Sequence, residues 1–105
     1  MTQFALIMTH PPDQCPIANS TVRKLAINMA SEMPKLARKF GIQFLAGPLV
    51  SNEHKGVAII TAEKVEAIND FLLESGLIQW NSVEVIPSQP MDEALKALDR
   101  IKPIY

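Results

Sequence analysis

The sequence predicts an α+β fold in which strands and helices follow in the order β-α-β-β-α-β, with one more helix at the C-terminus. Short apolar runs bounded by turn residues alternate with longer segments whose apolar residues recur at helical spacing. The length of 105 residues is typical of one domain, and 48% hydrophobic residues suffice for a core. We therefore expect a single domain over residues 1–105.

A proline-rich loop separates the first strand from the first helix. Within Gln3–Thr9 the apolar residues stand at consecutive positions, which indicates a strand covered on both faces. The apolar residues of Ser20–Phe40 recur at helical spacing, with Asn19 or Ser20 available as N-cap and a glycine directly after the end. This stripe keeps its phase across Pro34, so one kinked helix is expected.

Three further strands and two further helices complete the order. Ile42–Val50 is expected to be a strand, and its Gly47-Pro48 pair suits an edge strand or a bulge. A turn-rich segment then leads into the doubly apolar strand Val57–Ile60, so these two strands form a hairpin. Thr61 is available as N-cap of the helix that follows. The remaining elements are a helix, a strand and a helix, expected over Glu63–Ser75, over Leu77–Pro87 and from Pro90 onward.

This order of elements is the ferredoxin-like, or split βαβ, pattern. Right-handed crossovers make the first two strands parallel, with the third antiparallel to both. The end of the first strand, the turn after the second and the start of the fourth then lie at one end of the sheet. That places His10, His54 and Trp80 at one rim. The loop that carries Cys15 begins there too, although the topology predicts no distances.

The second face of the sheet needs a cover. The first and third strands are apolar on both sides, whereas the two main helices cover one face only. An uncovered apolar patch of roughly several hundred Å² is rare on a soluble monomer. We therefore expect a homodimer joined through the sheet face, with the last helix or the tail Lys102–Tyr105 helping to seal the joint.

The element order, the doubly apolar strands and the length resemble the dimeric α+β barrel superfamily, which includes the antibiotic-biosynthesis monooxygenase, muconolactone isomerase-like and YCII-like families. The stretches THPPDQCP and VEVIPSQPMDEALKAL are similar to a family of small uncharacterised proteins within it. The resemblance implies a dimeric barrel and, as in several relatives, a small-molecule pocket between sheet and helices. It carries over no catalytic residue, because these families place different side chains in that pocket.

Charge and composition limit the classes of partner and the cellular location that we expect. Ten basic and eleven acidic residues give a formal net charge of −1, with no basic block, so no nucleic-acid partner is expected. No segment approaches the ~20 apolar residues of a membrane span, and the N-terminus lacks the basic region of a signal peptide. One cysteine cannot form an internal disulfide, so we expect a reducing, cytoplasmic location.

His10, Cys15 and His54 are the candidate metal ligands. Two imidazole nitrogens and one thiolate sulfur suit zinc or copper, and Asp13 is a conceivable fourth ligand. The competing interpretation is structural: a free cysteine commonly packs as a small hydrophobe, and a histidine at a strand end or turn commonly bonds to the backbone. The sequence leaves both interpretations open.

Two functions follow from these candidates, beside a purely structural dimer. In the first, the protein binds a small ligand and holds zinc or copper at the rim. In the second, it is a cofactor-independent isomerase or monooxygenase-like enzyme, in which His10 moves a proton on a small aromatic or lactone substrate. Trp80, Met29 and Met33 are candidate lining residues of the ligand pocket, although core packing explains such residues more simply. A Cys15 nucleophile with His10 as base is rarely achieved within one short loop.

Overall fold

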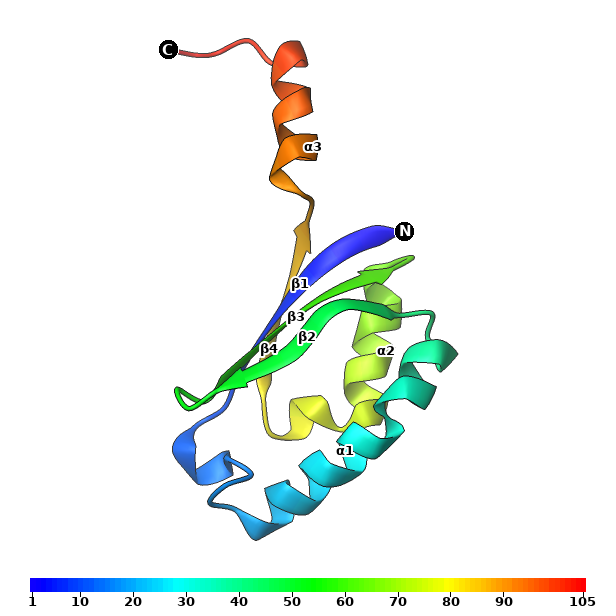
Figure 1. The fold of residues 1–105 in the computed structure, drawn as a ribbon, viewed down its shortest axis with the longest axis vertical. Coiled ribbons are helices and arrows are strands. Elements are labelled where there is room, and N and C mark those ends of the chain that lie inside the picture. The colour runs from blue at the N-terminus through cyan, green and yellow to red at the C-terminus, as the bar shows by residue number, and fades with distance from the viewer.

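The computed structural model describes residues 1–105 as an α+β fold with one four-stranded sheet and three α-helices (Figure 1). The strands are β1 (Thr2–Thr9), β2 (Gln43–Ser51), β3 (Lys55–Ala62) and β4 (Ser82–Ser88). The helices are α1 (Ser20–Lys39), α2 (Val65–Ser75) and α3 (Met91–Lys96). The predicted order of elements is confirmed, and short 3₁₀ turns lie at Pro12–Gln14, Leu77–Gln79 and Ala97–Arg100.

The sheet has the strand order β2-β3-β1-β4, and every neighbouring pair is antiparallel. The central strand β1 pairs with β3 along its whole length, from Thr2 opposite Ala62 to Thr9 opposite Lys55. Because β3 separates β1 from β2, those two strands run in the same direction, as predicted. The sheet is open, with β2 and β4 as its edges, and this arrangement is compatible with the ferredoxin-like fold.

The edge strand β2 carries the irregularity predicted from its Gly-Pro pair. Its register to β3 shifts between Phe44 and Ala46 and again between Ala46 and Leu49. Gly47 lies in this second interval with a φ of 80°, and a Cβ there would stand 2.7 Å from the Val57 carbonyl oxygen. Only glycine fits so close to the neighbouring strand.

Helix α1 is continuous through Pro34, as predicted. Asn19 is its N-cap, since its Oδ1 accepts a hydrogen bond from the Val22 backbone N–H at 3.0 Å. The chain leaves α1 through Gly41, which has a φ of 66°. The local signals at both ends of this helix were therefore sufficient to predict its start and, to within one residue, its end.

Several boundaries differ from the prediction, and β3 is longer than expected, since it spans Lys55–Ala62 instead of Val57–Ile60. Helix α2 begins at Val65 instead of Glu63, because β3 continues through Thr61 and pairs with strands on both sides. Two ladders of backbone hydrogen bonds outweigh the single bond that a Thr61 cap would make. Strand β4 begins only at Ser82, because Gly76 turns the chain at a φ of 79° and Leu77 anchors a 3₁₀ turn in the core.

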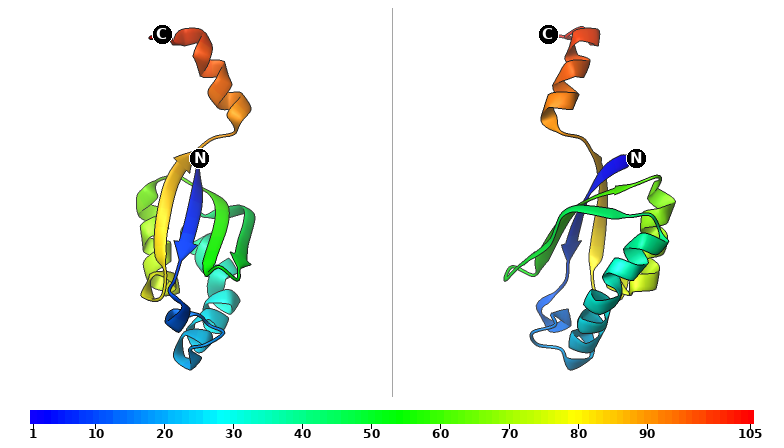
Figure 2. Two further views of the ribbon diagram at one scale, coloured as in Figure 1. Left: turned by 90° about the vertical axis from the view of Figure 1, so that its left-hand side faces the viewer. Right: turned by 45° about the vertical axis from the view of Figure 1, so that its right-hand side comes forward.

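The core lies between the sheet and the helices α1 and α2, which cover the same face of the sheet (Figure 2). Alternate residues of β1 and β3 point into it, because successive side chains of a strand face opposite sides. These strand residues are Phe4, Leu6, Met8, Ala58, Ile60 and Ala62. From α2 come the buried residues Ile68, Phe71 and Leu72.

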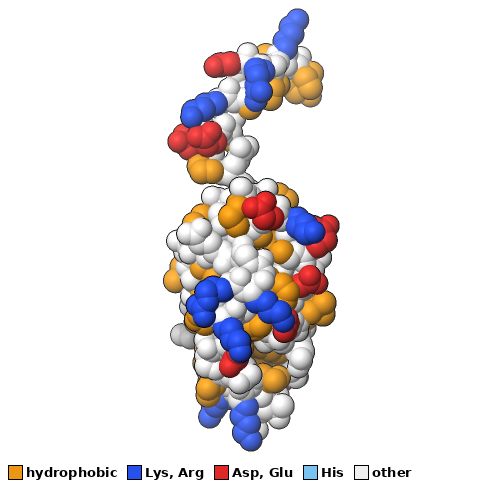
Figure 3. Space-filling view, turned by 90° about the vertical axis from the view of Figure 1, so that its right-hand side faces the viewer, with side chains coloured by type: hydrophobic (Ala, Val, Ile, Leu, Met, Phe, Trp, Pro, Cys, Tyr) orange, Lys and Arg blue, Asp and Glu red, His pale blue; other side chains and the backbone are white.

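The opposite face of the sheet carries no helix, as predicted (Figure 2). Helix α3 and the chain after it project beyond the end of the sheet and leave this face uncovered (Figures 1 and 2). The radius of gyration is accordingly 16.2 Å, whereas a compact chain of this length has about 13 Å. Figure 3 shows the projecting segment standing clear of a body whose surface mixes basic and acidic side chains.

None of the three helices combines the length and the apolar character that crossing a membrane requires.

Candidate functional site

The loop after β1 folds Cys15 back toward the end of the sheet. Pro12–Gln14 form a 3₁₀ turn, and the Cys15 N–H donates to the Pro12 carbonyl at 3.3 Å. The Cys15 carbonyl then accepts hydrogen bonds from the N–H groups of Ala18 and Asn19, at 3.0 and 2.9 Å. Although most of this loop is exposed, Cys15 itself is only 7% exposed.

Helix α1 holds this loop in place through two side chains. Arg23 donates from Nε to the Pro16 carbonyl at 2.9 Å and from Nη2 to the Ile17 carbonyl at 2.6 Å. Asn19 donates from Nδ2 to the Asp13 carbonyl at 3.0 Å. The position of Cys15 is therefore coupled to the first turn of α1.

His54 reaches the site from the turn between β2 and β3. Its φ of 62° lies in the left-handed region, which non-glycine residues adopt infrequently and histidine more readily than most. The His10 N–H donates to the His54 carbonyl at 3.1 Å, which extends the ladder between β1 and β3. The two imidazole rings then meet edge to face, with centroids 5.3 Å apart and planes at 75°.

Together, His10, Cys15 and His54 form a cluster of potential metal ligands. One ligand atom from each residue lies within 4.8 Å of the other two. Two ring nitrogens, His10 Nε2 and His54 Nδ1, are buried and have no hydrogen-bond partner. Leaving a buried polar atom unpaired costs about 1–3 kcal/mol. The structure thus brings together the three residues that the sequence nominated, whereas the exposed Asp13 lies outside the cluster.

Asn81 orients His10, and the sequence did not single it out. Its Oδ1 lies 3.1 Å from His10 Nδ1, while its Nδ2 donates to the Leu77 carbonyl at 3.2 Å. Because Nδ2 is committed to that carbonyl, Oδ1 faces the histidine and accepts the Nδ1 proton. The lone pair of His10 is then on Nε2. The only sequence signal was the position of Asn81 directly after Trp80 at the predicted rim.

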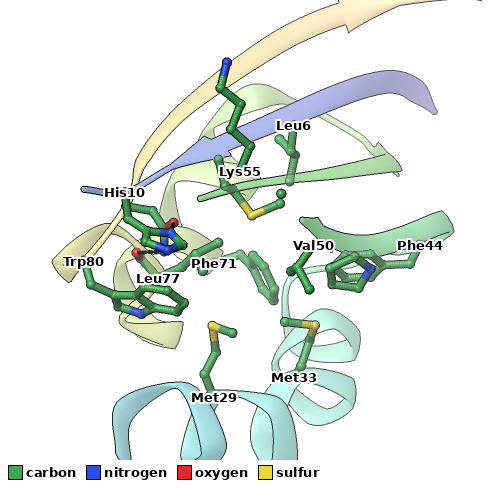
Figure 4. Close-up of a pocket in the computed structure, with 14 residues that line it drawn as sticks. Leu6, His10, Met29, Met33, Phe44, Val50, Lys55, Phe71, Leu77 and Trp80 are labelled. Atoms are coloured by element: carbon green, nitrogen blue, oxygen red, sulfur yellow. Dashed lines mark hydrogen bonds between the residues drawn. The ribbon is translucent and has the colours of Figure 1, made fainter. Parts of the chain in front are cut away.

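An apolar cavity of about 70 Å³ lies beside His10, between the sheet and α1 (Figure 4). Trp80, Met29 and Met33 line it, as do the buried Leu77 and Phe71. The Trp80 ring is tilted against the His10 ring, with centroids 5.3 Å apart. All three residues nominated for a ligand pocket therefore line one cavity, and His10 connects that cavity to the cluster.

The lining of the cavity beside the cluster contains little charge. Lys55 is the only charged residue that lines the cavity, and its side chain points away from it (Figure 4). The two ion pairs of the chain join Lys39 to Glu74 and Lys96 to Glu93, and neither involves a residue of the cluster. A positive ion at the cluster would therefore rely on the Cys15 thiolate for compensation of its charge.

No protein-family model matches the chain, and no curated protein matches it significantly. The resemblance to the dimeric α+β barrels therefore stands on the arrangement of elements and on short local stretches of sequence. What the protein does has to be inferred from the chemistry of His10, Cys15 and His54.

Proposed function

We propose that this protein binds a transition metal ion, zinc or copper, through His10, Cys15 and His54, as a subunit of a homodimeric α+β barrel. One observation carries the proposal. His10 Nε2 and His54 Nδ1 are both buried without a partner, inside a cluster whose third member is a cysteine. A bound metal ion would satisfy both nitrogens at once, and thiolate and imidazole are ligands that zinc and copper favour.

The spacing of the three atoms is close to that of a metal site. Zn–N bonds of about 2.0–2.1 Å and Zn–S bonds of about 2.3 Å place tetrahedral ligand atoms about 3.3–3.6 Å apart. The ligand atoms of the cluster are at most 4.8 Å apart, so binding would draw the most distant pair together by up to about 1.2–1.5 Å. Rotation of the Cys15 and His54 side chains supplies such a shift. His10 needs to move least, because Asn81 already holds its ring.

The adjoining cavity suits a very small ligand. In another protein, an engineered apolar cavity of about 150 Å³ binds benzene. The cavity beside His10 measures about 70 Å³, so it accommodates a molecule of only a few heavy atoms. Such a ligand would lie against Trp80, Met29 and Met33.

A second candidate function is that of a cofactor-independent isomerase or monooxygenase-like enzyme, with His10 as the acid or base. The observation in its favour is that His10 lines an apolar cavity. The volume of that cavity opposes it, because an aromatic or lactone substrate needs about twice the space. We therefore rank metal binding first.

The dimer is proposed from the helix-free face of the sheet. The register sets Ile7 beside Val57 and Ala5 between Ile59 and Ile86, which makes an apolar surface with Glu84 at its β4 edge. Val57 is 40% exposed and Ile86 39% exposed. A surface of this kind favours a second copy of the chain as its cover. The projecting α3 adds further exposed apolar residues, namely Met91, Leu95, Leu98 and Ile101.

Metal analysis of tag-free protein tests the proposed site. We expect about one zinc or copper ion per chain, and loss of the metal in Cys15→Ser and in His54→Ala. Glu53→Ala is the matched control, because Glu53 lies exposed in the same turn as His54. Folded protein that takes up neither zinc nor cuprous ion on reconstitution would overturn the proposal. In that case, proton exchange on small carbonyl compounds by wild type and His10→Ala becomes the next measurement.

A further inference from the structure

We infer that the ion selected by this site is cuprous copper, bound by three ligands, in preference to zinc; the inference rests on the metal site proposed above. Three features of the cluster and its surroundings support this selection: the number of ligands, their summed charge and the chemical character of the cavity lining.

The cluster offers three ligands and no fourth. The chain contains no other histidine or cysteine, and no carboxylate belongs to the cluster. Zinc sites in proteins are almost always four-coordinate, so zinc would need a solvent molecule here. Yet His10 Nε2 and His54 Nδ1 are buried, and the adjoining cavity is apolar. A cuprous ion is stable with two or three ligands and has a strong affinity for thiolate sulfur.

The net charge of the metal complex also favours cuprous ion over zinc. The Cys15 thiolate carries one negative charge and the two imidazoles carry none, so a cuprous complex is neutral whereas a zinc complex keeps one positive charge. No acidic side chain belongs to the cluster or lines the cavity. Lys55, the charged residue nearest the cavity, is itself basic. An uncompensated charge among buried ligand atoms beside an apolar cavity is disfavoured, so the monovalent ion is preferred.

The cavity lining also contains sulfur atoms, which are soft metal ligands. Met29 and Met33 extend from α1 into the cavity that His10 lines (Figure 4), and Met8 lines it from β1. Thioether sulfur binds cuprous ion but contributes little to zinc affinity. An ion that enters or leaves through the cavity therefore meets weak ligands for copper and none for zinc.

The chain contains an intrinsic fluorescent probe of metal binding. Trp80 is the only tryptophan, and its ring centroid lies 5.3 Å from that of His10. An ion on His10 Nε2 changes the surroundings of the indole, so Trp80 emission should change in proportion to occupancy. The same signal serves for both metals, which makes their affinities directly comparable.

The test is a pair of anaerobic titrations followed by Trp80 emission. Cuprous ion is delivered from its bicinchoninate complex, and zinc is delivered in competition with 4-(2-pyridylazo)resorcinol. We expect one cuprous ion per chain, retained against about a 100-fold excess of zinc. X-ray absorption at the copper edge should then show one sulfur and two nitrogen ligands.

A charge variant tests the electrostatic part of the argument. Asn81→Asp adds one negative charge beside His10 while keeping an acceptor for the Nδ1 proton. This charge compensates the positive charge of a zinc complex, so the variant should bind zinc more tightly. The ratio of the copper affinity to the zinc affinity should therefore fall. Asn69→Asp, on the exposed surface of α2, is the control for the added charge alone and should leave the preference unchanged.

The outcomes separate the two proposals. Wild-type protein that binds zinc with four ligands and loses copper to excess zinc would refute the inference and leave the metal site standing. Folded protein that binds neither ion would remove both. An Asn81→Asp variant with an unchanged ratio of affinities would refute the charge argument, and the ligand count from X-ray absorption would then decide the inference.

Discussion

Replacement of Asn81 by leucine tests whether the carboxamide prepares His10 for metal binding. Leucine has a similar branched shape but no polar atom, so His10 Nδ1 loses an acceptor 3.1 Å away. The ring proton is then free to move to Nε2, where it blocks the metal. Loss of such a supporting partner lowers metal affinity about 10- to 100-fold, which is about 1.4–2.8 kcal/mol of binding free energy.

The same substitution also affects the metal-free protein. The Leu77 carbonyl loses the Asn81 Nδ2–H donor at 3.2 Å, so two hydrogen bonds disappear together. At about 0.5–1.5 kcal/mol each, their loss lowers the free energy of unfolding by about 1–3 kcal/mol. Chelator competition measures the affinity and urea denaturation of the metal-free protein measures the stability, with Asn69→Leu as the exposed control. A folded Asn81→Leu protein with wild-type metal affinity would contradict the assigned role.

Three further outcomes are expected. Arg23→Gln removes the hydrogen bonds that hold the Cys15 loop and should lower the metal affinity several-fold. Circular dichroism should show the helicity of the wild type, and the control Lys24→Gln, at an exposed neighbouring position, should leave the metal affinity unchanged. Removal of the metal with a chelator should lower the melting temperature, because an ion that binds only the folded chain stabilises it; an unchanged melting temperature would argue against these ligands. Val57→Lys, on the helix-free face, should convert the proposed dimer to monomer in light scattering without loss of metal, whereas an unchanged mass would exclude this face as the interface.

Much of the fold was predictable because its signals are local. The spacing of apolar residues in α1, the Asn19 cap and the Gly41 exit each depend on a few adjacent residues. The boundaries that were wrong depend on partners far along the chain. Thr61 belongs to β3 because strands on both sides pair with it, and no local sequence pattern predicts such pairing. The 3₁₀ turn at Leu77 likewise depends on a core position that only the packed molecule provides.

For the candidate site, residue types and strand order were enough to nominate His10, Cys15 and His54 at one end of the sheet. Their separation was beyond prediction, because it depends on the left-handed turn at His54 and on the folded-back loop at Cys15. The same holds for Asn81, whose importance lies in the direction of one carboxamide.

The sequence by itself determined the order of elements, the covered and uncovered faces of the sheet and the shared rim, because periodicity and handedness act over short stretches of chain. Tertiary structure alone decided the 4.8 Å cluster, its two buried unpartnered nitrogens and the apolar cavity beside them. Those features arise where the loop after β1, the β2–β3 turn and the start of β4 pack together. Packing of distant segments sets atomic distances, and the chemistry of a site depends on those distances.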